Sequence, residues 1–236
     1  MKPERIIELA AELGVRVQPE QAHQMLQHAR LMLIRNQELN LTGVTAPEEV
    51  LVKHIIDSLT PLILWGELVR EEGGGPVIDV GTGAGYPGLV LAIMCREEEF
   101  VLVEARAKKA AFVREVAEHL GLRNVSVVWA RAEDVGRKPQ YREQFAVALA
   151  RAVAPLRVLS EYLLPLVQVG GVMLAFKGPA VREELQAAAQ ALKVLGGGDV
   201  ARVSLQLPGA QGERRELVVV KKVRPTPTRY PRRAGV

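Results

Sequence analysis

A short glycine-rich loop is the part of the sequence best suited to bind a ligand. In PVIDVGTGAGYPGLVLAI (76–93), Gly81, Gly83 and Gly85 follow an apolar run that contains Asp79. Glycine permits a tight turn and lets backbone amides approach a ligand without a Cβ atom in the way. The loop is not a P-loop, because no Gly-Lys-Ser/Thr follows. It is not the nicotinamide fingerprint G-x-G-x-x-G either, because Tyr86 occupies the third glycine position.

Two carboxylates near this loop indicate a ligand without phosphate. Asp79, two residues before the first glycine, would repel a pyrophosphate but suits an amino group or a sulfonium. Glu104 ends the next apolar run, roughly 20 residues beyond the loop, a spacing typical of a carboxylate that binds the ribose hydroxyls of an adenosine. Together they predict a site for S-adenosylmethionine. The alternative, a turn that serves only helix–strand packing, stays open at this point.

Hydrophobic periodicity predicts the elements that must position these residues. Ranges 4–13, 19–40 and 47–65 have helical spacing, and beyond a glycine-rich boundary at 71–76 short β-branched runs alternate with helices. Strands that are apolar on both faces predict a parallel sheet covered by helices, and two closely spaced strands at the end predict an antiparallel hairpin. We therefore predict an α/β fold with a doubly wound, mostly parallel seven-stranded sheet and an N-terminal helical extension. The predicted strands are 77–80, 100–105, 125–130, 145–150, 171–176, 200–207 and 214–223.

The composition excludes several classes of protein. The chain has 236 residues and one cysteine, which excludes an internal disulfide framework and any cysteine-clustered zinc or iron–sulfur site. That residue, Cys95, lies in the apolar run GLVLAIMC, so we expect a buried core cysteine rather than a nucleophile. The N-terminus does not resemble a signal peptide, and no apolar run approaches the ~20 residues of a membrane helix. We expect a cytoplasmic protein with no membrane association.

Positive charge is concentrated near the C-terminal end. The net charge is +4, and residues 221–236 contain no acidic residue. A basic segment with proline and a tyrosine is typical of phosphate contact, although a solvated tail that only aids solubility has the same composition. The basic residues of this segment are Lys221, Lys222, Arg224, Arg229, Arg232 and Arg233.

Several motifs, in order, point to one family. DVGTGAGYPG (79–88) resembles the loop of the bacterial small-subunit ribosomal RNA guanine-N7 methyltransferases, the RsmG or glucose-inhibited division protein B family. NQELNLTG (36–43) and HIIDS (54–58) resemble its N-terminal motifs. RAE (131–133), RAVA (151–154), KG (177–178) and TPTRYPRRAG (226–235) follow in the family's order. The resemblance implies a helical cap over 1–70, a class I methyltransferase domain over 71–223 and a basic tail over 224–236.

The resemblance also implies roles for individual residues. Gly81 and Tyr86 would contact S-adenosylmethionine, and Ala132 and Glu133 would lie at its adenine. Arg151 would face the cofactor and the reacting base, the alternative being a structural ion pair. Arg151, Lys177 and Arg131 are the catalytic candidates, and Lys177 and Arg131 would also meet RNA phosphate. The full set of cofactor candidates is Asp79, Gly81, Gly83, Gly85, Tyr86, Glu104, Ala132, Glu133 and Arg151. The RNA candidates are Arg131, Lys177, Lys221, Lys222, Arg224, Arg229, Arg232 and Arg233.

The implied partner is 16S rRNA, in the small ribosomal subunit or its assembly intermediate, and no metal is implied. Three polar residues, His54, Asp57 and Ser58, fall on one helix face. They favour a hydrogen-bonded brace between the N-terminal helices and the cofactor domain over a hydrolase triad, because successive turns of one helix supply no oxyanion hole. The chain departs from the family in Arg35, where tryptophan is usual, and in Ala146, where an acid is usual.

The implied reaction sets limits on mechanism and substrate. N7 of guanine carries a lone pair and no proton, so its methylation requires no general base and depends on alignment. In A-form RNA the N7 edge lies in a groove too deep and narrow for side chains, so the target must be unpaired, distorted or flipped out. Two rival functions remain. Tyr86 and Asp79 disfavour a nicotinamide oxidoreductase, whereas Ala146 leaves open a non-catalytic factor that binds S-adenosylmethionine and RNA.

Overall fold

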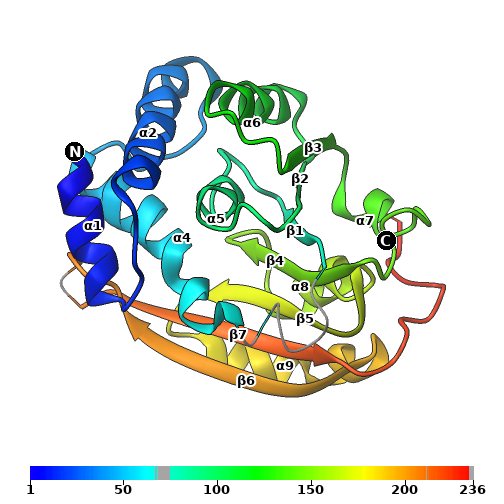
Figure 1. Ribbon diagram of the computed structural model, residues 1–236. Coiled ribbons are helices and arrows are strands. Elements are labelled where there is room, and N and C mark those ends of the chain that lie inside the picture. Colours follow the sequence, from blue (N-terminus) through cyan, green and yellow to red (C-terminus); the bar gives the residue numbers. More distant parts are fainter. Residues whose placement is uncertain (67, 69–74, 211, 234–236) are drawn as a thin grey trace.

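The structure, a computed structural model, describes residues 1–66, 68, 75–210 and 212–233 (Figure 1). Its sheet is built from β1 (Val77–Val80), β2 (Phe100–Glu104), β3 (Val125–Trp129), β4 (Phe145–Arg151), β5 (Val167–Lys177), β6 (Gly197–Gln206) and β7 (Arg214–Lys222). The strand order is β3-β2-β1-β4-β5-β7-β6. Strands β1 to β5 pair in parallel, and β7 runs antiparallel to both β5 and β6. The predicted fold class and the closing hairpin are confirmed.

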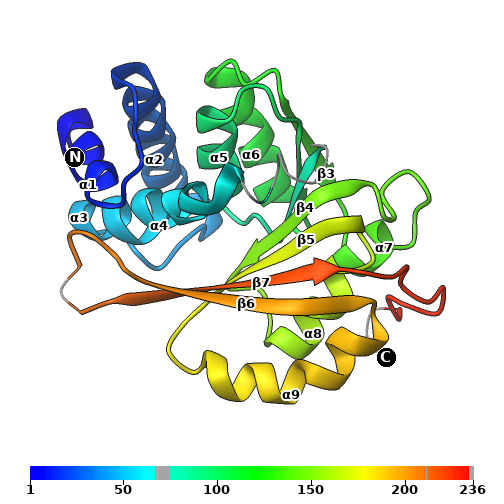
Figure 2. The same cartoon turned by 60° about the horizontal axis from the view of Figure 1, so that its bottom comes forward.

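Helices cover both faces of the sheet (Figure 2). On one face lie α5 (Gly88–Met94) and α6 (Ala107–His119), beside the N-terminal helices, and on the other lie α8 (Leu156–Leu163) and α9 (Val181–Val194). The short α7 (Ala132–Val135) follows β3. Two separate hydrophobic clusters fill the spaces between the sheet and its two helical layers. The central strand β4 is buried from Phe145 to Ala150, which explains why it is apolar at successive positions instead of alternate ones.

The first two N-terminal helices begin at prolines. α1 (Pro3–Glu12) and α2 (Pro19–Leu39) start with proline at the first helical position, where no hydrogen bond is lost. In α2 the side chains of Gln18 and Gln21 cap each other's backbone amides, and Asn40 ends the helix in the left-handed conformation. The predicted helix over 47–65 is instead a series of short segments. They are α3 (Pro47–Val50), the π-helical η1 (Leu51–Ile56), α4 (Asp57–Leu59) and the 3₁₀-helical η2 (Thr60–Leu64).

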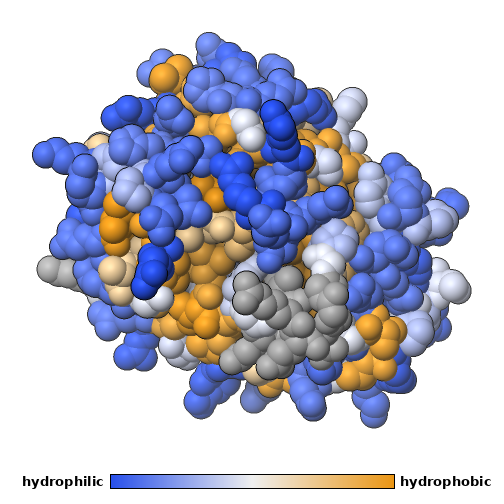
Figure 3. All heavy atoms as spheres, in the orientation of Figure 1, coloured by the Kyte–Doolittle hydropathy of each residue, from blue (hydrophilic) through white to orange (hydrophobic). Residues whose placement is uncertain are grey.

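Two sequence predictions need qualification at this level. The boundary predicted at 71–76 lies mostly outside the described residues, since only Gly75 and Pro76 belong to them. Cys95 is partly buried, because it caps the C-terminus of α5 instead of lying within the helix. No helix in the described parts of the chain is both long and apolar enough to cross a membrane. Hydrophilic residues cover much of the face shown in Figure 3.

Candidate active site

A cavity opens at the carboxyl end of the parallel strands, where β1 and β4 pair and the chain continues from them in different directions. In a doubly wound sheet this switch point is where ligands bind. We call it the loop cavity. Its volume is about 470 Å³, and its walls include residues 81–84 of the glycine loop, Glu104 and Arg151. Gly81 and Gly83 have φ of +73° and +62°, a region that residues with side chains rarely adopt.

Glu104 lies on the wall of the loop cavity, at the end of β2. Its Oε2 atom accepts a hydrogen bond from the Gly83 amide at 3.0 Å, and its Oε1 atom accepts one from the Arg106 amide at 2.8 Å. These bonds fix the carboxylate against the glycine loop. Each oxygen keeps a further lone pair that a ligand hydroxyl can use. The arrangement fits the predicted binding of ribose hydroxyls.

Asp79 lies beneath the loop and not on the cavity wall. Its side chain is fully buried, and Oδ2 accepts a hydrogen bond from the Gly88 amide at 3.0 Å. Burial raises the pKa of Asp79 to about 6. A Cβ atom at residue 88 would lie 2.7 Å from Oδ2, so glycine is required there. The predicted contact between Asp79 and the ligand's amino group is therefore not supported; Asp79 anchors the start of α5.

Tyr86 is the centre of a stack of three rings beside the loop cavity. Its ring stacks on those of His28 and His54, with centroids 4.1 and 4.9 Å away. The Nε2–H of His28 donates to the Ala84 carbonyl at 2.7 Å. Burial lowers the pKa of both histidines to about 4, so both are neutral at pH 7. The Tyr86 hydroxyl is buried without a partner among the described residues, and Tyr86 lines the cavity, which is the pattern expected where a ligand supplies the missing partner.

Gly85 serves packing, unlike the two glycines before it. Its φ is +91°, and a Cβ atom there would lie 2.4 Å from Cδ1 of Leu89 and 3.3 Å from Cε1 of His28. It is absent from the walls of the loop cavity. The predicted cofactor contact of Gly85 is therefore not supported, and for this glycine the packing alternative holds.

A smaller cavity of about 230 Å³ lies on the other side of Gly81 and Val153, which line both cavities. We call it the side cavity. Ala132 and Glu133 of α7 line it, together with Arg131, whose side chain is exposed. A Cβ atom at residue 81 would lie 2.7 Å from Cγ2 of Val153, so glycine is needed at this contact. The structure thus brings the residues predicted for adenine next to the residue predicted for ribose.

Arg151, at the end of β4, belongs to a buried ionic cluster. Its Nη1 atom donates to Oδ2 of Asp57 at 3.0 Å and to the Lys53 carbonyl at 2.8 Å. Arg215 of β7 donates to both oxygens of the same carboxylate, and Asp57 is fully buried. We call Asp57, Arg151 and Arg215 the Asp57 cluster. It confirms the brace expected between the N-terminal helices and the cofactor domain, although His54 bonds to Thr42 instead.

The structural interpretation of Arg151 is confirmed, and its role toward the cofactor and the base stays a prediction. It forms a structural ion pair, yet it also lines the loop cavity, with Cζ 5.7 Å from the Tyr86 ring centroid. The next residue, Ala152, has φ of +56°, a conformation that costs an L-residue about 1–2 kcal/mol. Strain of this kind collects at functional sites. Arg151, Ala152 and His54 also line a third cavity of about 420 Å³, which we call the arginine cavity.

Lys177, at the end of β5, is held by protein groups. Its ammonium donates to Oε2 of Glu184 at 2.6 Å and to the Ala154 carbonyl at 2.8 Å, and only 8% of the residue is exposed. It lines the arginine cavity. The predicted contact with RNA phosphate is therefore not supported, and the observed role of Lys177 is to anchor the loop that follows β4.

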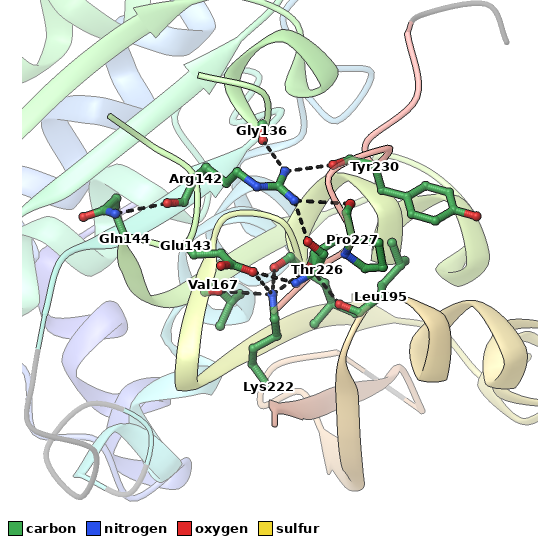
Figure 4. Close-up of polar contacts among 11 residues, drawn as sticks. Gly136, Arg142, Glu143, Gln144, Val167, Leu195, Lys222, Thr226, Pro227 and Tyr230 are labelled. Carbon is green, nitrogen blue, oxygen red and sulfur yellow. Dashed lines mark hydrogen bonds and ion pairs between the residues drawn. The ribbon is translucent and has the colours of Figure 1, made fainter. Parts of the chain in front are cut away.

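The C-terminal segment is docked on the domain (Figure 4). Lys222 is fully buried, and its ammonium donates to Glu143, to Oγ1 of Thr226 and to the carbonyls of Leu164 and Val167. The predicted contact of Lys222 with RNA is wrong, because no phosphate can reach it. Beside it the Arg142 guanidinium donates to the carbonyls of Gly136, Thr226, Pro227 and Tyr230. We call Lys222, Glu143, Arg142 and Thr226 the tail clasp.

The other basic residues of the C-terminal segment are exposed. Arg232 pairs with Glu161 through a contact of 2.8 Å, and Arg224 donates to the Lys193 carbonyl at 2.8 Å. The Arg229 guanidinium lies over the Tyr230 ring, 5.1 Å from its centroid. The cations of this segment that remain accessible for RNA are Lys221, Arg224, Arg229, Arg232 and Arg233.

The sequence analysis missed Arg215 and Val153. Arg215 acts through Asp57, which lies 158 positions away, so no local pattern announces the pair. Val153 belongs to a motif that the sequence analysis noted, but its position between two cavities depends on how β1 and β4 pair. No group of three or more His, Cys, Asp or Glu side chains in the described ranges is placed to hold a metal ion.

Comparisons with known proteins agree with this geometry. A family model described as rRNA small subunit methyltransferase G matches residues 21–218. The chain belongs to this family. It is 47% identical to a ribosomal RNA small subunit methyltransferase G of Pelotomaculum thermopropionicum over 99% of this chain and 95% of that one. The corresponding protein of Moorella thermoacetica is 44% identical over 95% of this chain and 92% of its own length.

Solved structures share the fold at low identity. A SAM-dependent methyltransferase from Aquifex aeolicus matches with a TM-score of 0.54 and 19% identity, over 78% of this chain and 97% of that one. A precorrin-6y C5,15-methyltransferase from Geobacter metallireducens matches with a TM-score of 0.50 and 14% identity, over 69% and 87%. Family and fold together identify an rRNA methyltransferase that uses S-adenosylmethionine, as the sequence predicted.

Proposed function

We propose that the protein transfers a methyl group from S-adenosylmethionine to N7 of a guanine in a loop of 16S rRNA. The observation that supports this most is the pair of adjoining cavities at the sheet's switch point, with Glu104 on one wall and Glu133 on the other, in a chain of the small-subunit methyltransferase family. The substrate is the small ribosomal subunit or its assembly intermediate. Such an enzyme acts where ribosomes are assembled, so we place it in the cytoplasm.

The residues around the two cavities fit this cofactor. Glu104 would accept hydrogen bonds from the ribose hydroxyls, and Ala132 and Glu133 would lie at the adenine. Tyr86 and the backbone of Gly81 and Gly83 would face the rest of the molecule. When bound, the cofactor supplies an electrophilic methyl group on a sulfonium.

The protein's own contribution is alignment in a neutral setting. N7 has no proton to remove, so no side chain has to act as a base, and orientation alone can supply roughly 7–11 kcal/mol of the barrier. His28 and His54 stay neutral at pH 7 because burial lowers their pKa to about 4. Neutral rings beside the loop cavity add no repulsion toward a cationic sulfonium.

RNA binding would use the cations that remain exposed around the site. Arg106 and Lys109 line the loop cavity, Arg131 lines the side cavity, and Arg229 and Arg233 lie on the docked C-terminal segment. Because these contacts would be ionic, affinity should fall steeply as salt rises. We propose that residues 1–70 act as the helical cap, 71–223 as the catalytic domain and 224–236 as an RNA-contacting tail.

The test is to incubate the protein with methyl-labelled S-adenosylmethionine and unmodified small ribosomal subunits. Borohydride reduction and aniline cleavage then map 7-methylguanine on the 16S rRNA. One strong stop at a loop guanine is the expected result. Cofactor binding with no incorporation into rRNA would favour a non-catalytic binding protein. Incorporation without a cleavage stop would move the reaction to another atom.

A further inference from the structure

The arginine cavity is not lined by Glu104, Ala132 or Glu133, the residues proposed to bind the adenosine of the cofactor. It adjoins the loop cavity through His54, Arg151 and Ala152, so anything bound in it lies next to the place where the methyl group is presented. Its volume of about 420 Å³ lies within the range of small-ligand pockets, roughly 300–1,000 Å³. A methyltransferase needs such a second site for its acceptor.

The donors on its wall are unequally used. The Lys177 ammonium is paired with Glu184, and the Arg215 guanidinium is paired with Asp57 and with the Lys177 carbonyl. Lys53 pairs with Glu49 and Glu213. Arg151 differs, because within the described residues its hydrogen bonds use Nη1 alone. Nε and Nη2 of Arg151 are therefore the donors left for a ligand on the wall that both cavities share.

Guanine matches this donor. Its N7 edge carries two neighbouring acceptors, N7 and O6. N7 must stay open toward the methyl group, so O6 is the atom that a protein donor can hold without blocking the reaction. We propose that the arginine cavity receives the target guanine, that Arg151 donates to its O6, and that Asp57 and Arg215 are positioning residues for Arg151. This rests on the proposed function.

The Asp57 cluster is built for positioning. The carboxylate of Asp57 is fully buried and comes from the N-terminal helices, whereas its two arginines come from β4 and β7. A guanidinium held at Nη1 by a carboxylate and a backbone carbonyl cannot rotate freely, so its remaining N–H groups keep one direction. The counter-charge of Asp57 also limits repulsion between Arg151 and a base that becomes cationic on methylation.

The experiment replaces the target base in reconstituted small subunits. The mapped position carries guanine, inosine, which keeps O6 and N7, or 2-aminopurine, which keeps N7 but lacks O6. Single-turnover methyl transfer is measured for the wild-type protein and for Asp57→Asn and Arg215→Lys. We expect the wild type to accept inosine within a few-fold of guanine. For each protein, discrimination is the rate of methyl transfer to guanine divided by the rate for 2-aminopurine. We expect this ratio to be roughly 10- to 100-fold larger for the wild type than for Asp57→Asn, the range for a hydrogen bond to a charged group.

Dividing the wild-type discrimination by that of the variant cancels the difference in intrinsic reactivity between guanine and 2-aminopurine. Calorimetric binding of S-adenosylmethionine, expected within a few-fold of wild type in both variants, shows that the cofactor site is intact. Arg215→Lys should keep more of the discrimination than Asp57→Asn. Equal discrimination by the wild type and Asp57→Asn, with cofactor binding intact, overturns the proposal.

A second readout needs no turnover and no variant that folds poorly. Subunits with 6-thioguanine at the target are irradiated with the wild-type protein, and the cross-linked peptide is identified. We expect peptides that contain residues 53–57, 151 or 176–178. A cross-link confined to β3 or to residues 224–233 contradicts the proposal. No methylation of guanine by the wild type would reject the proposed function instead, and the cross-link would still report where the base lies.

Discussion

Two ionic clusters among the described residues tie distant segments together, but their cations differ in the donors that remain. The Asp57 cluster joins an N-terminal helix to β4 and β7, and its Arg151 borders two cavities. The tail clasp joins Lys222 of β7 to Glu143 and Thr226, and the ammonium contacts four oxygens of the protein itself. In the Asp57 cluster, Arg151 forms its hydrogen bonds to described residues through Nη1 and keeps Nε and Nη2 for a ligand. In the tail clasp, protein oxygens use all the N–H groups of Lys222. The number of remaining donors, more than the charge, therefore separates a cation that can bind a ligand from one that holds the fold.

The largest expected effect comes from removing the acid of the first cluster. Asp57→Ala leaves two partly buried arginines without their fully buried carboxylate, which should lower the free energy of unfolding by about 3–5 kcal/mol. It should also abolish methyl transfer at temperatures where the variant is still folded. Denaturant unfolding and the labelled-methyl assay measure the two effects. Full activity in a folded Asp57→Ala variant would show that the cluster is a brace and nothing more.

Lys222→Met gives the matched test of the tail clasp. It leaves the Leu164 and Val167 carbonyls without their donor, so we expect the free energy of unfolding to fall by about 2–4 kcal/mol. Methyl transfer and the salt dependence of RNA binding should not change. A weaker salt dependence of RNA binding in Lys222→Met would support the direct contact between Lys222 and RNA that the sequence predicted.

The clasp also has a pH signature. Burial lowers the pKa of Lys222 to about 8, below its usual value near 10.5, so the unfolded chain binds more protons between these values. Stability from this group should therefore rise as pH increases from 8 to 10. Denaturant unfolding of the wild type and of Lys222→Met across this pH range measures the effect. The same pH dependence of the free energy of unfolding in both proteins would contradict the prediction.

Sequence patterns predicted what depends on neighbours in the chain. Runs of β-branched residues located the strands and a period of about 3.6 residues located the helices, and Glu104 could be singled out because its distance from the loop is fixed by one strand–helix–strand unit. The alternation of side chains along a strand places Lys222 on the same face of β7 as Val218 and Val220, both fully buried. Treating Lys221 and Lys222 alike as basic residues ignored that rule. Arg215 was out of reach, because only the folded chain brings it to Asp57.

At the proposed cofactor site, Glu104→Gln should weaken the binding of S-adenosylmethionine by roughly 10- to 100-fold. The amide keeps one acceptor where the carboxylate had two, and hydrogen bonds to a charged group are worth about 1.5–3 kcal/mol. Calorimetry measures the affinity. Glu161→Gln is the control, since that carboxylate pairs with Arg232 away from the loop cavity and should leave cofactor affinity unchanged. Equal affinities of the wild type, Glu104→Gln and Glu161→Gln for S-adenosylmethionine would show that Glu104 does not bind the ribose.

The ring stack at the site responds to acid, whereas the clasp responds to alkali. His28 and His54 have pKa values of about 4 in the fold, below the usual 6.5, so stability is lost as pH falls from 6.5 toward 4. Each contributes up to about 1.4 kcal/mol per pH unit. Asp79 acts oppositely, because its pKa of about 6 makes the fold bind a proton that the unfolded chain does not. His28→Gln should therefore flatten the acid slope and Asp79→Asn should steepen it, and unfolding curves between pH 4.5 and 6.5 decide the point.

The smallest effect is expected at exposed cations of the docked segment. Arg229→Gln and Arg233→Gln remove charges that take no part in the tail clasp, so the stability of the fold should change by less than about 0.5 kcal/mol. If these side chains meet phosphate, each substitution should lower the slope of log affinity against log salt by about 1, as loss of one released counterion requires. Filter binding of small subunits at several salt concentrations measures the slope. Lys222→Met carries the same change in charge in the same segment, yet its buried ammonium releases no counterion, so its slope should match wild type. Equal slopes for all four proteins would mean that this segment is held on the domain for the sake of the fold, and that Arg106, Lys109 and Arg131 around the cavities carry the RNA.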